Sequence, residues 1–435
     1  MIRTTSEITD WTKTVFICLD GESGAVPAGL LTIYEQGIRP VRSTFVYGNR
    51  YRERKNAIAV DPESLALAEA NRTGKPVTFE PPAGLALFGA IRDSAPDSWG
   101  RRVIENSLDA EPNSLPETDY LAHAGPHRTG ALDFRDSPTA AAQIGKLPDA
   151  KDLKYLLDAS AMIQEGRPVP RNLDVYFTVG ATFGGARPKA VVLDKARQWV
   201  AKFPAINDGF NVPLIERATL QLARQCGLRV PDLAHVRLAD GRDVMLIERF
   251  DRLPLATGGF ARRHMVSALT MLRLHESDTA AARYADLAEV LNNHGASGFV
   301  ALDKVELFKR MVFNVLVSND DDHLRNHAFV WDGARNGWRL SDLYDVVPKP
   351  QVATQRYLVL GVGQKGRLAT LENALSAAGQ FGILAGDAVA YINEIASVVR
   401  EWRTWFDEYG VPQSECDKVA SAFRNPKDIG LAHIK

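Results

Sequence analysis

The most polar segment of this 435-residue chain is Ser318-Asn-Asp-Asp-Asp-His-Leu-Arg-Asn-His327, which lies between the apolar segments 311–317 and 328–331. Charged side chains between buried elements cost free energy unless they have a task, so this segment is a candidate functional loop. Shortly downstream, Leu340-Ser-Asp-Leu-Tyr-Asp345 again follows a strand-like run. Together the two segments supply a candidate base, an amide oxygen and a second carboxylate.

Phosphoryl transfer needs these three groups. One Asp accepts or orients the attacking hydroxyl, and an Asn and a second Asp give magnesium the hard oxygen ligands that it prefers. The spacing from Asp321 to Asn326 equals the Asp-to-Asn spacing of a protein-kinase catalytic loop. Asp345 follows as the second carboxylate, and Arg325 could offset charge on the transferred group.

A phosphate-binding site is predicted upstream of these loops. The segment Gly180-Ala-Thr-Phe-Gly-Gly-Ala-Arg-Pro188 lies between two β-type runs and predicts a Gly-rich hairpin, with Gly184 and Gly185 close to the cofactor. Lys202 on the next strand is expected to complete this phosphate-binding site, and Glu216 on the following predicted helix is placed to hold that lysine. Protein kinases use these parts in the same order.

The predicted fold class is α+β, in three parts. Residues 1–150 form an N-terminal α/β domain that opens with a small sheet between residues 15 and 51 and carries no obvious catalytic set. Residues 151–252 form a β-rich lobe with the Gly-rich loop, and residues 253–435 form a helical lobe with the catalytic and magnesium-binding loops. This is the organisation of a two-lobed protein kinase. Helical periodicity predicts helices over 213–227, 280–294, 301–318 and 385–408.

The composition is that of an ordinary globular protein, with 45% apolar and 24% charged residues, so we expect an ordered chain. A net charge of −1 provides no global attraction for nucleic acid or for an anionic membrane. Cys18, Cys226 and Cys416 lack CxxC spacing, which argues against a disulfide framework and a structural zinc site. Neither a signal peptide nor a membrane span is predicted, so we expect a cytoplasmic protein without membrane contact.

The chain resembles the HipA toxin kinases in the content and order of four segments: Thr182-Phe-Gly-Gly-Ala-Arg-Pro-Lys189, Ile247-Glu-Arg-Phe-Asp-Arg252, Asn319-Asp-Asp-Asp-His-Leu-Arg-Asn326 and Leu343-Tyr-Asp-Val-Val347. A fifth segment, Ala95-Pro-Asp-Ser-Trp-Gly-Arg-Arg102, looks like the Pro-Asp-x-Trp-Gly-Arg element of the same family's N-terminal domain. The resemblance implies a serine/threonine protein kinase that uses ATP and Mg²⁺ and is the toxin half of a bacterial toxin–antitoxin pair.

The resemblance also implies roles for residues of the two polar loops. Asp321 is implied as the catalytic base, and Asn326 and Asp345 as the magnesium ligands. His323 and Arg325 are expected beside the cofactor, with His323 stabilising the loop.

For ATP, the resemblance implies that Lys202 contacts the phosphates and that Glu248 and Phe250 present backbone groups to adenine. Thr182 falls where family members carry an autophosphorylated serine, although the residue here is Thr. A phosphate inside the phosphate-binding loop would repel ATP and eject the loop, which would inactivate the kinase.

Partners follow from the resemblance alone. It implies a protein substrate in translation, such as an aminoacyl-tRNA synthetase, whose phosphorylation causes growth arrest and persistence. It also implies a HipB-like helix-turn-helix antitoxin that neutralises the kinase and makes most of the contact with operator DNA.

Several alternatives stay open at this point. Asp320, Asp321 and Asp322 are consecutive, so the operative carboxylate is not assigned by position alone, and all three could belong to a solvated turn. His323 and His327 lie four apart and could bind a transition metal, although clustered carboxylates favour a harder ion.

Two other functions are compatible with the same motifs. A small-molecule phosphotransferase of the aminoglycoside or choline kinase kind shares the Asp-to-Asn loop and would have an acidic pocket for a cationic substrate. A catalytically silent co-repressor would bind its antitoxin and operator without nucleotide turnover.

Overall fold

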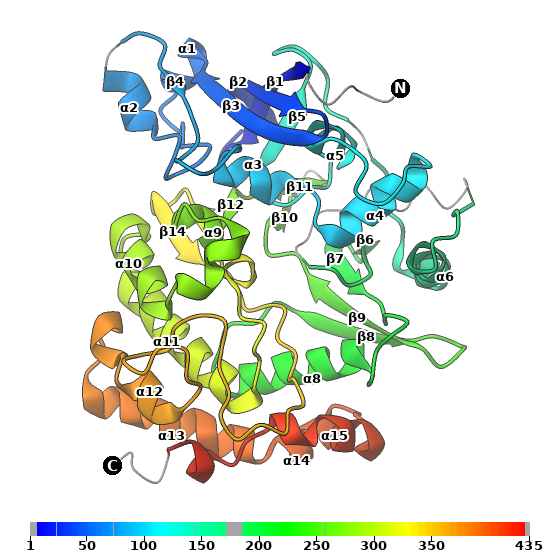
Figure 1. Ribbon diagram of the computed structural model, residues 1–435, viewed down its shortest axis with the longest axis vertical. Coiled ribbons are helices and arrows are strands. Elements are labelled where there is room, and N and C mark those ends of the chain that lie inside the picture. Colours follow the sequence, from blue (N-terminus) through cyan, green and yellow to red (C-terminus); the bar gives the residue numbers. More distant parts are fainter. Residues whose placement is uncertain are drawn as a thin grey trace. The chain divides into compact units, whose positions relative to one another are not determined.

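Five antiparallel strands form a sheet in the order β4-β3-β2-β1-β5 (Figure 1). Apolar side chains such as Ile33 and Phe45 are fully buried, as expected for a sheet with one face against a core. The small sheet predicted between residues 15 and 51 is present and begins earlier than expected, at Ile8. Its strands are β1 (Ile8–Cys18), β2 (Ala25–Gln36), β3 (Arg39–Tyr47), β4 (Thr78–Phe79) and β5 (Leu132–Arg135).

The computed structural model describes residues 7–22, 24–72, 74–143, 145–170, 185–256 and 258–430. The chain divides into two units, of which the first contains Met1–Ile206 and Glu248–His275. The second contains Asn207–Ile247 and Glu276–Lys435. The three domains predicted with boundaries at residues 150 and 252 stay a prediction.

A tight hairpin follows in the first unit. Strands β6 (Lys189–Asp194) and β7 (Arg197–Lys202) pair antiparallel, with Lys189 opposite Lys202. The two turn residues, Lys195 and Ala196, have φ values of 47° and 60°. Positive φ at both positions is typical of a type I′ turn, whose twist matches that of the paired strands. The sequence predicted these two strands, over 189–193 and 198–203. The Gly-rich hairpin predicted between 173–179 and 189–193 stays a prediction, because its first strand lies outside the described residues.

Short elements complete the first unit. The predicted strand over 173–179 lies outside the described residues, together with Thr182 and Gly184. The helices are α1 (Asn49–Arg52), α2 (Leu67–Arg72), α3 (Gly89–Ser94), α4 (Ser98–Ser107), α5 (Glu117–His123), η1 (Ala150–Asp152), α6 (Leu153–Gln164) and α9 (Ala268–Met271), and the remaining strands are β10 (Arg252–Pro254), β11 (Phe260–Arg262) and β12 (Met265–Ser267).

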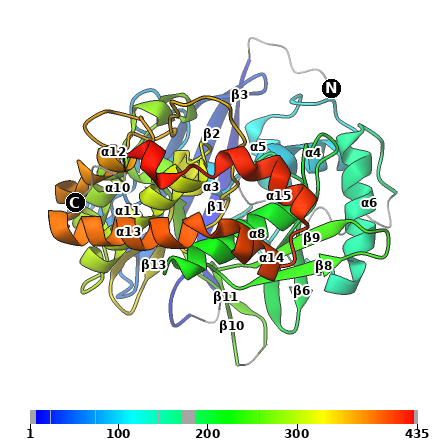
Figure 2. The ribbon, with the colours of Figure 1, turned by 90° about the horizontal axis from the view of Figure 1, so that it is seen from below.

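The second unit is mostly helical, and α11 (Val300–Val317) is buried along most of its C-terminal half. Helices α10 (Tyr284–His294) and α13 (Ala385–Arg400) pack against α11 (Figure 2). The other elements are α8 (Val212–Gln225), β8 (Leu233–Arg237), β9 (Asp243–Glu248), η2 (Glu276–Ala281), η3 (Leu324–Asn326), β13 (Ala328–Asp332), β14 (Gly337–Leu340), α12 (Leu371–Leu375), η4 (Ala378–Phe381), α14 (Trp402–Glu408), α15 (Gln413–Val419), η5 (Ala420–Ala422) and η6 (Pro426–Ile429).

The predicted helices are largely present, with one error. Helix α8 matches the prediction over 213–227 to within two residues at each end. It begins after Asn211, whose side chain caps the helix by accepting a hydrogen bond from the Leu214 amide. The single helix predicted over 385–408 is wrong, since the helix breaks at Glu401 between α13 and α14. Trp402, just beyond the break, stacks on Phe423 with 4.0 Å between ring centroids. This tertiary contact is invisible to helical periodicity.

In the described part of the chain, no helix is both long enough and apolar enough to cross a membrane.

Candidate functional site

The polar loop begins where α11 ends. Ser318 terminates the helix in the left-handed conformation, with φ of 51°, and its hydroxyl donates a hydrogen bond to the Ala422 carbonyl at 2.7 Å. The three consecutive carboxylates that follow have different environments: Asp321 is exposed, Asp322 is buried and Asp320 is intermediate. The structure therefore separates residues that the sequence could not rank.

Asp322 anchors the loop from inside. Its Oδ2 accepts a hydrogen bond from the Tyr284 hydroxyl at 2.8 Å, and its Oδ1 accepts one from the Val359 amide at 2.6 Å. Tyr284 also accepts from Asn314 Nδ2 on α11 at 2.9 Å, and Asn319 Nδ2 donates to Asn314 Oδ1 at 3.1 Å. Burial raises the pKa of Asp322 to about 7. These contacts assign Asp322 to holding the loop.

Asp320 is engaged with a neighbouring segment. Its Oδ2 accepts a hydrogen bond from Gln351 Nε2 at 2.5 Å, and Lys349 Nζ lies 3.5 Å from its Oδ1. Asp321 is the most exposed of the three carboxylates, which suits a base that must meet a hydroxyl from another molecule.

The predicted magnesium ligands lie on segments that contact each other. Asn326 Nδ2 donates a hydrogen bond to the Asp321 carbonyl at 2.7 Å, which closes the loop on itself. The Tyr344 hydroxyl donates to the Arg325 carbonyl at 2.8 Å and so brings the neighbouring Asp345 toward the same loop. Asp345 has a left-handed φ of 54°. This conformation is uncommon for a residue other than Gly and is often found at functional sites.

The other polar side chains of the loop have structural contacts. Arg325 pairs with Glu276 at 2.5 Å, so the cation predicted to face the transferred group is held by a carboxylate. His323 is half-buried. Burial lowers the pKa of His327 to about 3, and its ring packs edge-on against Tyr284. His327 is therefore a neutral core residue.

The metal-binding alternative for the two histidines gains no support. Among the residues that the structure describes, no three His, Cys, Asp or Glu side chains gather into a group that could hold a metal ion. A pair such as Asn326 and Asp345 still fits magnesium, which usually takes one or two protein ligands and completes its shell with phosphate and water oxygens.

The residues predicted to contact ATP are placed as follows. In the first unit, Lys202 is buried at the end of β7, and Gly185 has a φ of 112°, which only Gly adopts readily. Glu248 pairs with Arg197 at 3.0 Å, and the Phe250 carbonyl accepts a long hydrogen bond from Arg263 at 3.5 Å. In the second unit, Glu216 is buried on α8. Thr182 and Gly184 lie outside the described residues.

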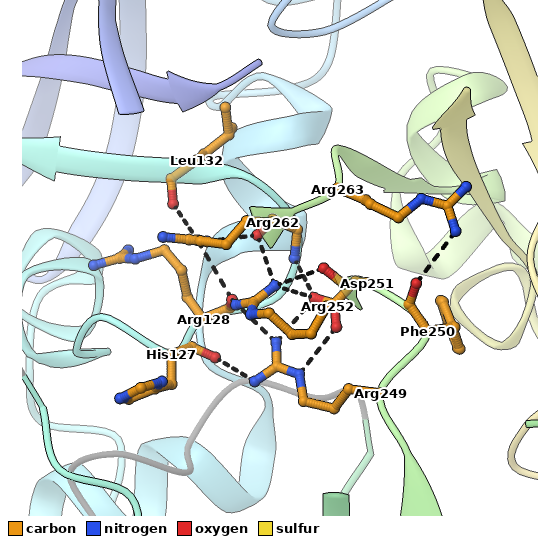
Figure 3. A network of polar contacts seen from close by, with 10 residues as sticks. His127, Arg128, Leu132, Arg249, Phe250, Asp251, Arg252, Arg262 and Arg263 are labelled. Atoms are coloured by element: carbon orange, nitrogen blue, oxygen red, sulfur yellow. Dashed lines mark hydrogen bonds and ion pairs between the residues drawn. The ribbon is translucent and has the colours of Figure 1, made fainter. Parts of the chain in front are cut away.

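Sequence reasoning missed a buried ion cluster of Arg249, Asp251 and Arg252, next to Phe250 (Figure 3). The Asp251 carboxylate accepts two hydrogen bonds from Arg249 at 2.9 Å each, one from Arg252 at 2.7 Å and one from the Gly130 amide at 2.8 Å. Burial alone would raise the pKa of Asp251, but the charges of Arg249 and Arg252 outweigh burial and lower it. Asp251 is therefore an ionised group in a dry interior.

Arg249 and Arg252 also bind the backbone of residues 127–130. Arg249 donates to the His127 carbonyl at 2.9 Å, and Arg252 donates to the Arg128 and Gly130 carbonyls at 2.6 and 3.1 Å (Figure 3). Arg262 adds a hydrogen bond to the Leu132 carbonyl at 2.8 Å. The available sequence signal was an Asp between two Arg in a strand-rich segment. The backbone groups that these arginines bind, however, lie more than a hundred residues upstream.

With this geometry established, comparison with known proteins assigns the family. Residues 181–402, more than half of the chain, match the family described as the HipA-like C-terminal domain. The chain belongs to this family. The resemblance found in the motifs is thereby confirmed.

Two curated relatives of this HipA-like protein come from Sinorhizobium fredii. "Putative kinase Y4mE" is 26% identical over 310 residues, which cover 66% of this chain and 69% of that protein. "Putative kinase Y4dM" is 26% identical over 185 residues, which cover 40% of this chain and 43% of that protein.

A solved structure shares the fold of this HipA-like chain. It is a chain from the complex of HipA, HipB and operator DNA of the Shewanella oneidensis MR-1 toxin–antitoxin system, with a TM-score of 0.64 and 16% identity. The match covers 97% of this chain and 96% of that one. The α+β class predicted from the sequence is confirmed.

Proposed function

We propose that this protein is a HipA-like toxin that acts as an ATP- and Mg²⁺-dependent serine/threonine protein kinase. The observation that carries the proposal is the loop in which Asp321 is exposed while Asn326 closes the loop on the Asp321 carbonyl at 2.7 Å. Tyr344 links this loop to the segment of Asp345 at 2.8 Å. Membership of the HipA-like family and the kinase names of two relatives support the same function.

In this proposal, Asn326 and Asp345 hold Mg²⁺, and both offer the oxygen atoms that this ion prefers. The bound ion would neutralise charge on the ATP phosphates. Asp321 accepts the proton of a Ser or Thr hydroxyl as the hydroxyl oxygen bonds to the γ-phosphorus and the bond from that phosphorus to ADP breaks. His323 stabilises the loop. Arg325, whose guanidinium Glu276 holds at 2.5 Å, would offset negative charge beside the transferred group from that position.

The proposed ATP contacts come from the motifs of the upstream segments. Lys202 binds the phosphates with the backbone at Gly184 and Gly185, and Glu216 orients Lys202. Glu248 and Phe250 present backbone groups to adenine. Autophosphorylation of Thr182 would inactivate the enzyme, because a dianion in the phosphate-binding loop repels ATP.

The proposed biological role is growth arrest in the cytoplasm through phosphorylation of a translation component such as an aminoacyl-tRNA synthetase. A HipB-like antitoxin would neutralise the kinase and carry most of the contact with operator DNA. The support is the assembly of HipA with HipB and operator DNA named for the Shewanella oneidensis complex, whose matched chain has the same fold.

The test is incubation with Mg-ATP followed by intact-mass and peptide mass spectrometry. We expect a phosphate on Thr182 in the parent and at least about a hundredfold slower incorporation in Asp321→Asn, which removes the base. Asp320→Asn is the matched control, because it changes the neighbouring carboxylate and should keep most of the activity. Nucleotide binding without any transfer would favour a silent co-repressor, and equal loss in both variants would contradict the assignment of Asp321.

A further inference from the structure

In the Pro-Asp-Ser-Trp segment at the start of α4, the Asp97 carboxylate makes two contacts. Asp97 Oδ1 accepts a hydrogen bond from the Gly100 amide at 2.7 Å and so caps the helix. Its Oδ2 accepts one from Lys189 Nζ at 2.6 Å, across 92 positions of sequence. The side chains of Lys189 and Asp97 are only 4% and 10% exposed, so this ion pair is well shielded from solvent. A shielded pair holds its geometry more firmly than a surface pair.

Trp99 holds the same lysine by its backbone. The indole Nε1 donates a hydrogen bond to the Lys189 carbonyl at 2.9 Å, and Trp99 is 1% exposed. Lys189 is therefore fixed at both its amine and its carbonyl by residues of one helix start. A packing role alone would explain the burial of the ring but not the direction of its N–H group.

Lys189 also contacts the end of the Gly-rich segment. The same Lys189 Nζ that pairs with Asp97 donates a hydrogen bond to the Gly185 carbonyl at 3.1 Å. Gly185 has a φ of 112°, and a Cβ built on it would lie 3.5 Å from Lys189 Nζ. The position of Gly185 is thus set by a lysine that itself depends on Asp97.

We propose that Asp97 and Trp99 are positioning residues for nucleotide binding, which hold Lys189 so that the Gly-rich loop ends in a fixed place at Gly185. The inference rests on the proposed ATP-dependent function and deepens it. It gives the Pro-Asp-Ser-Trp motif a function: to set the affinity for ATP from a helix far upstream in the sequence.

The main test is Asp97→Asn, which keeps a capping oxygen but removes the charge that faces Lys189. We expect the KM for Mg-ATP to rise about tenfold while kcat stays within about twofold, since loop placement and not the reacting groups is changed. Trp99→Phe removes the N–H donor and part of the buried ring but keeps the charge that faces Lys189, so it should raise the KM less. Glu117→Gln is the matched control: it weakens the ion pair of Arg101 on the same helix, without contacting Lys189, and should leave the KM unchanged.

The double variant Asp97→Asn with Lys189→Met separates positioning from stability. It leaves no buried unpaired amine, so the melting temperature should recover toward that of the parent while the KM stays raised. Recovery of the KM together with the melting temperature would overturn the positioning role.

Hydrogen exchange of the nucleotide-free protein provides a readout that does not depend on ATP. Amides from Gly185 to Val191 should exchange faster in Asp97→Asn than in the parent, and unchanged exchange would overturn the inference. If the parent binds no Mg-ATP, the proposed function fails and the nucleotide part of the inference fails with it. Exchange still decides whether Asp97 anchors Gly185.

Discussion

Two buried aspartates in different regions of the molecule have opposite pKa shifts. Asp251 in the first unit is 0% exposed and has a lowered pKa, whereas Asp322 in the second unit is 1% exposed and its pKa is raised to about 7. Burial acting alone would raise the pKa of both carboxyls. The difference lies in their donors, because Asp251 faces the guanidinium groups of Arg249 and Arg252, and Asp322 faces a neutral hydroxyl and a neutral amide.

The comparison shows that two equally buried aspartates can stabilise the fold in different ways, one as a charged group and one with little charge. The charge of Asp251 holds Arg249 and Arg252 in place, and these arginines in turn bind the backbone of residues 127–130. Asp322 anchors its loop with little charge below neutral pH.

The largest expected effect is that of Asp251→Asn, which leaves two arginines buried without their counter-charge. We expect the free energy of unfolding to fall by about 3–5 kcal/mol in urea denaturation. Because the folded-state pKa is lowered, the contribution of Asp251 is present above its unfolded pKa near 4 and is lost only as pH falls below that value. The effect should therefore be constant between pH 5 and 8. A loss below about 1 kcal/mol would mean that the cluster does not depend on this charge.

Asp322→Asn should have a smaller effect that depends on pH. The amide has one oxygen, so it can keep only one of the donors Tyr284 and Val359, and we expect a loss of about 1–2 kcal/mol at pH 5 in EDTA. Because the folded-state pKa is raised, the contribution of Asp322 is fully present below its unfolded pKa and is lost as pH rises through 7.

The stability advantage of the parent over Asp322→Asn should therefore shrink by about 1 kcal/mol between pH 6 and 7. Urea denaturation of both proteins at several pH values measures this difference. An advantage that does not change from pH 5 to 8 would show that Asp322 is ionised like Asp251 and would remove the contrast between them.

The smallest effect is expected for Arg263→Gln, a control within the same region. Arg263 lies beside the cluster (Figure 3). The contact drawn for its side chain is a long hydrogen bond to the Phe250 carbonyl, at 3.5 Å. The free energy of unfolding should change by less than about 0.5 kcal/mol. A loss comparable to that of Asp251→Asn would show that the cluster extends further than its short contacts.

Local patterns predicted much of this protein correctly. The strands over 189–193 and 198–203, the helix over 213–227 and the α+β class all follow from residue periodicity and local propensity, which act over a few positions. The single helix predicted over 385–408 was wrong: the helix breaks at Glu401, next to Trp402, whose stacking on Phe423 is a contact that no local pattern contains.

The sequence by itself determined which chemical groups the chain carries and in what order, and therefore its family and its candidate loop from Asp321 to Asn326. Only the tertiary structure decided which of three consecutive aspartates is exposed and which is an anchor. It also paired Asp97 with Lys189 across 92 positions and Asp251 with Gly130 across 121. The physical reason is that burial and counter-charge set the state of an ionisable group, and both come from residues that meet only when the chain folds.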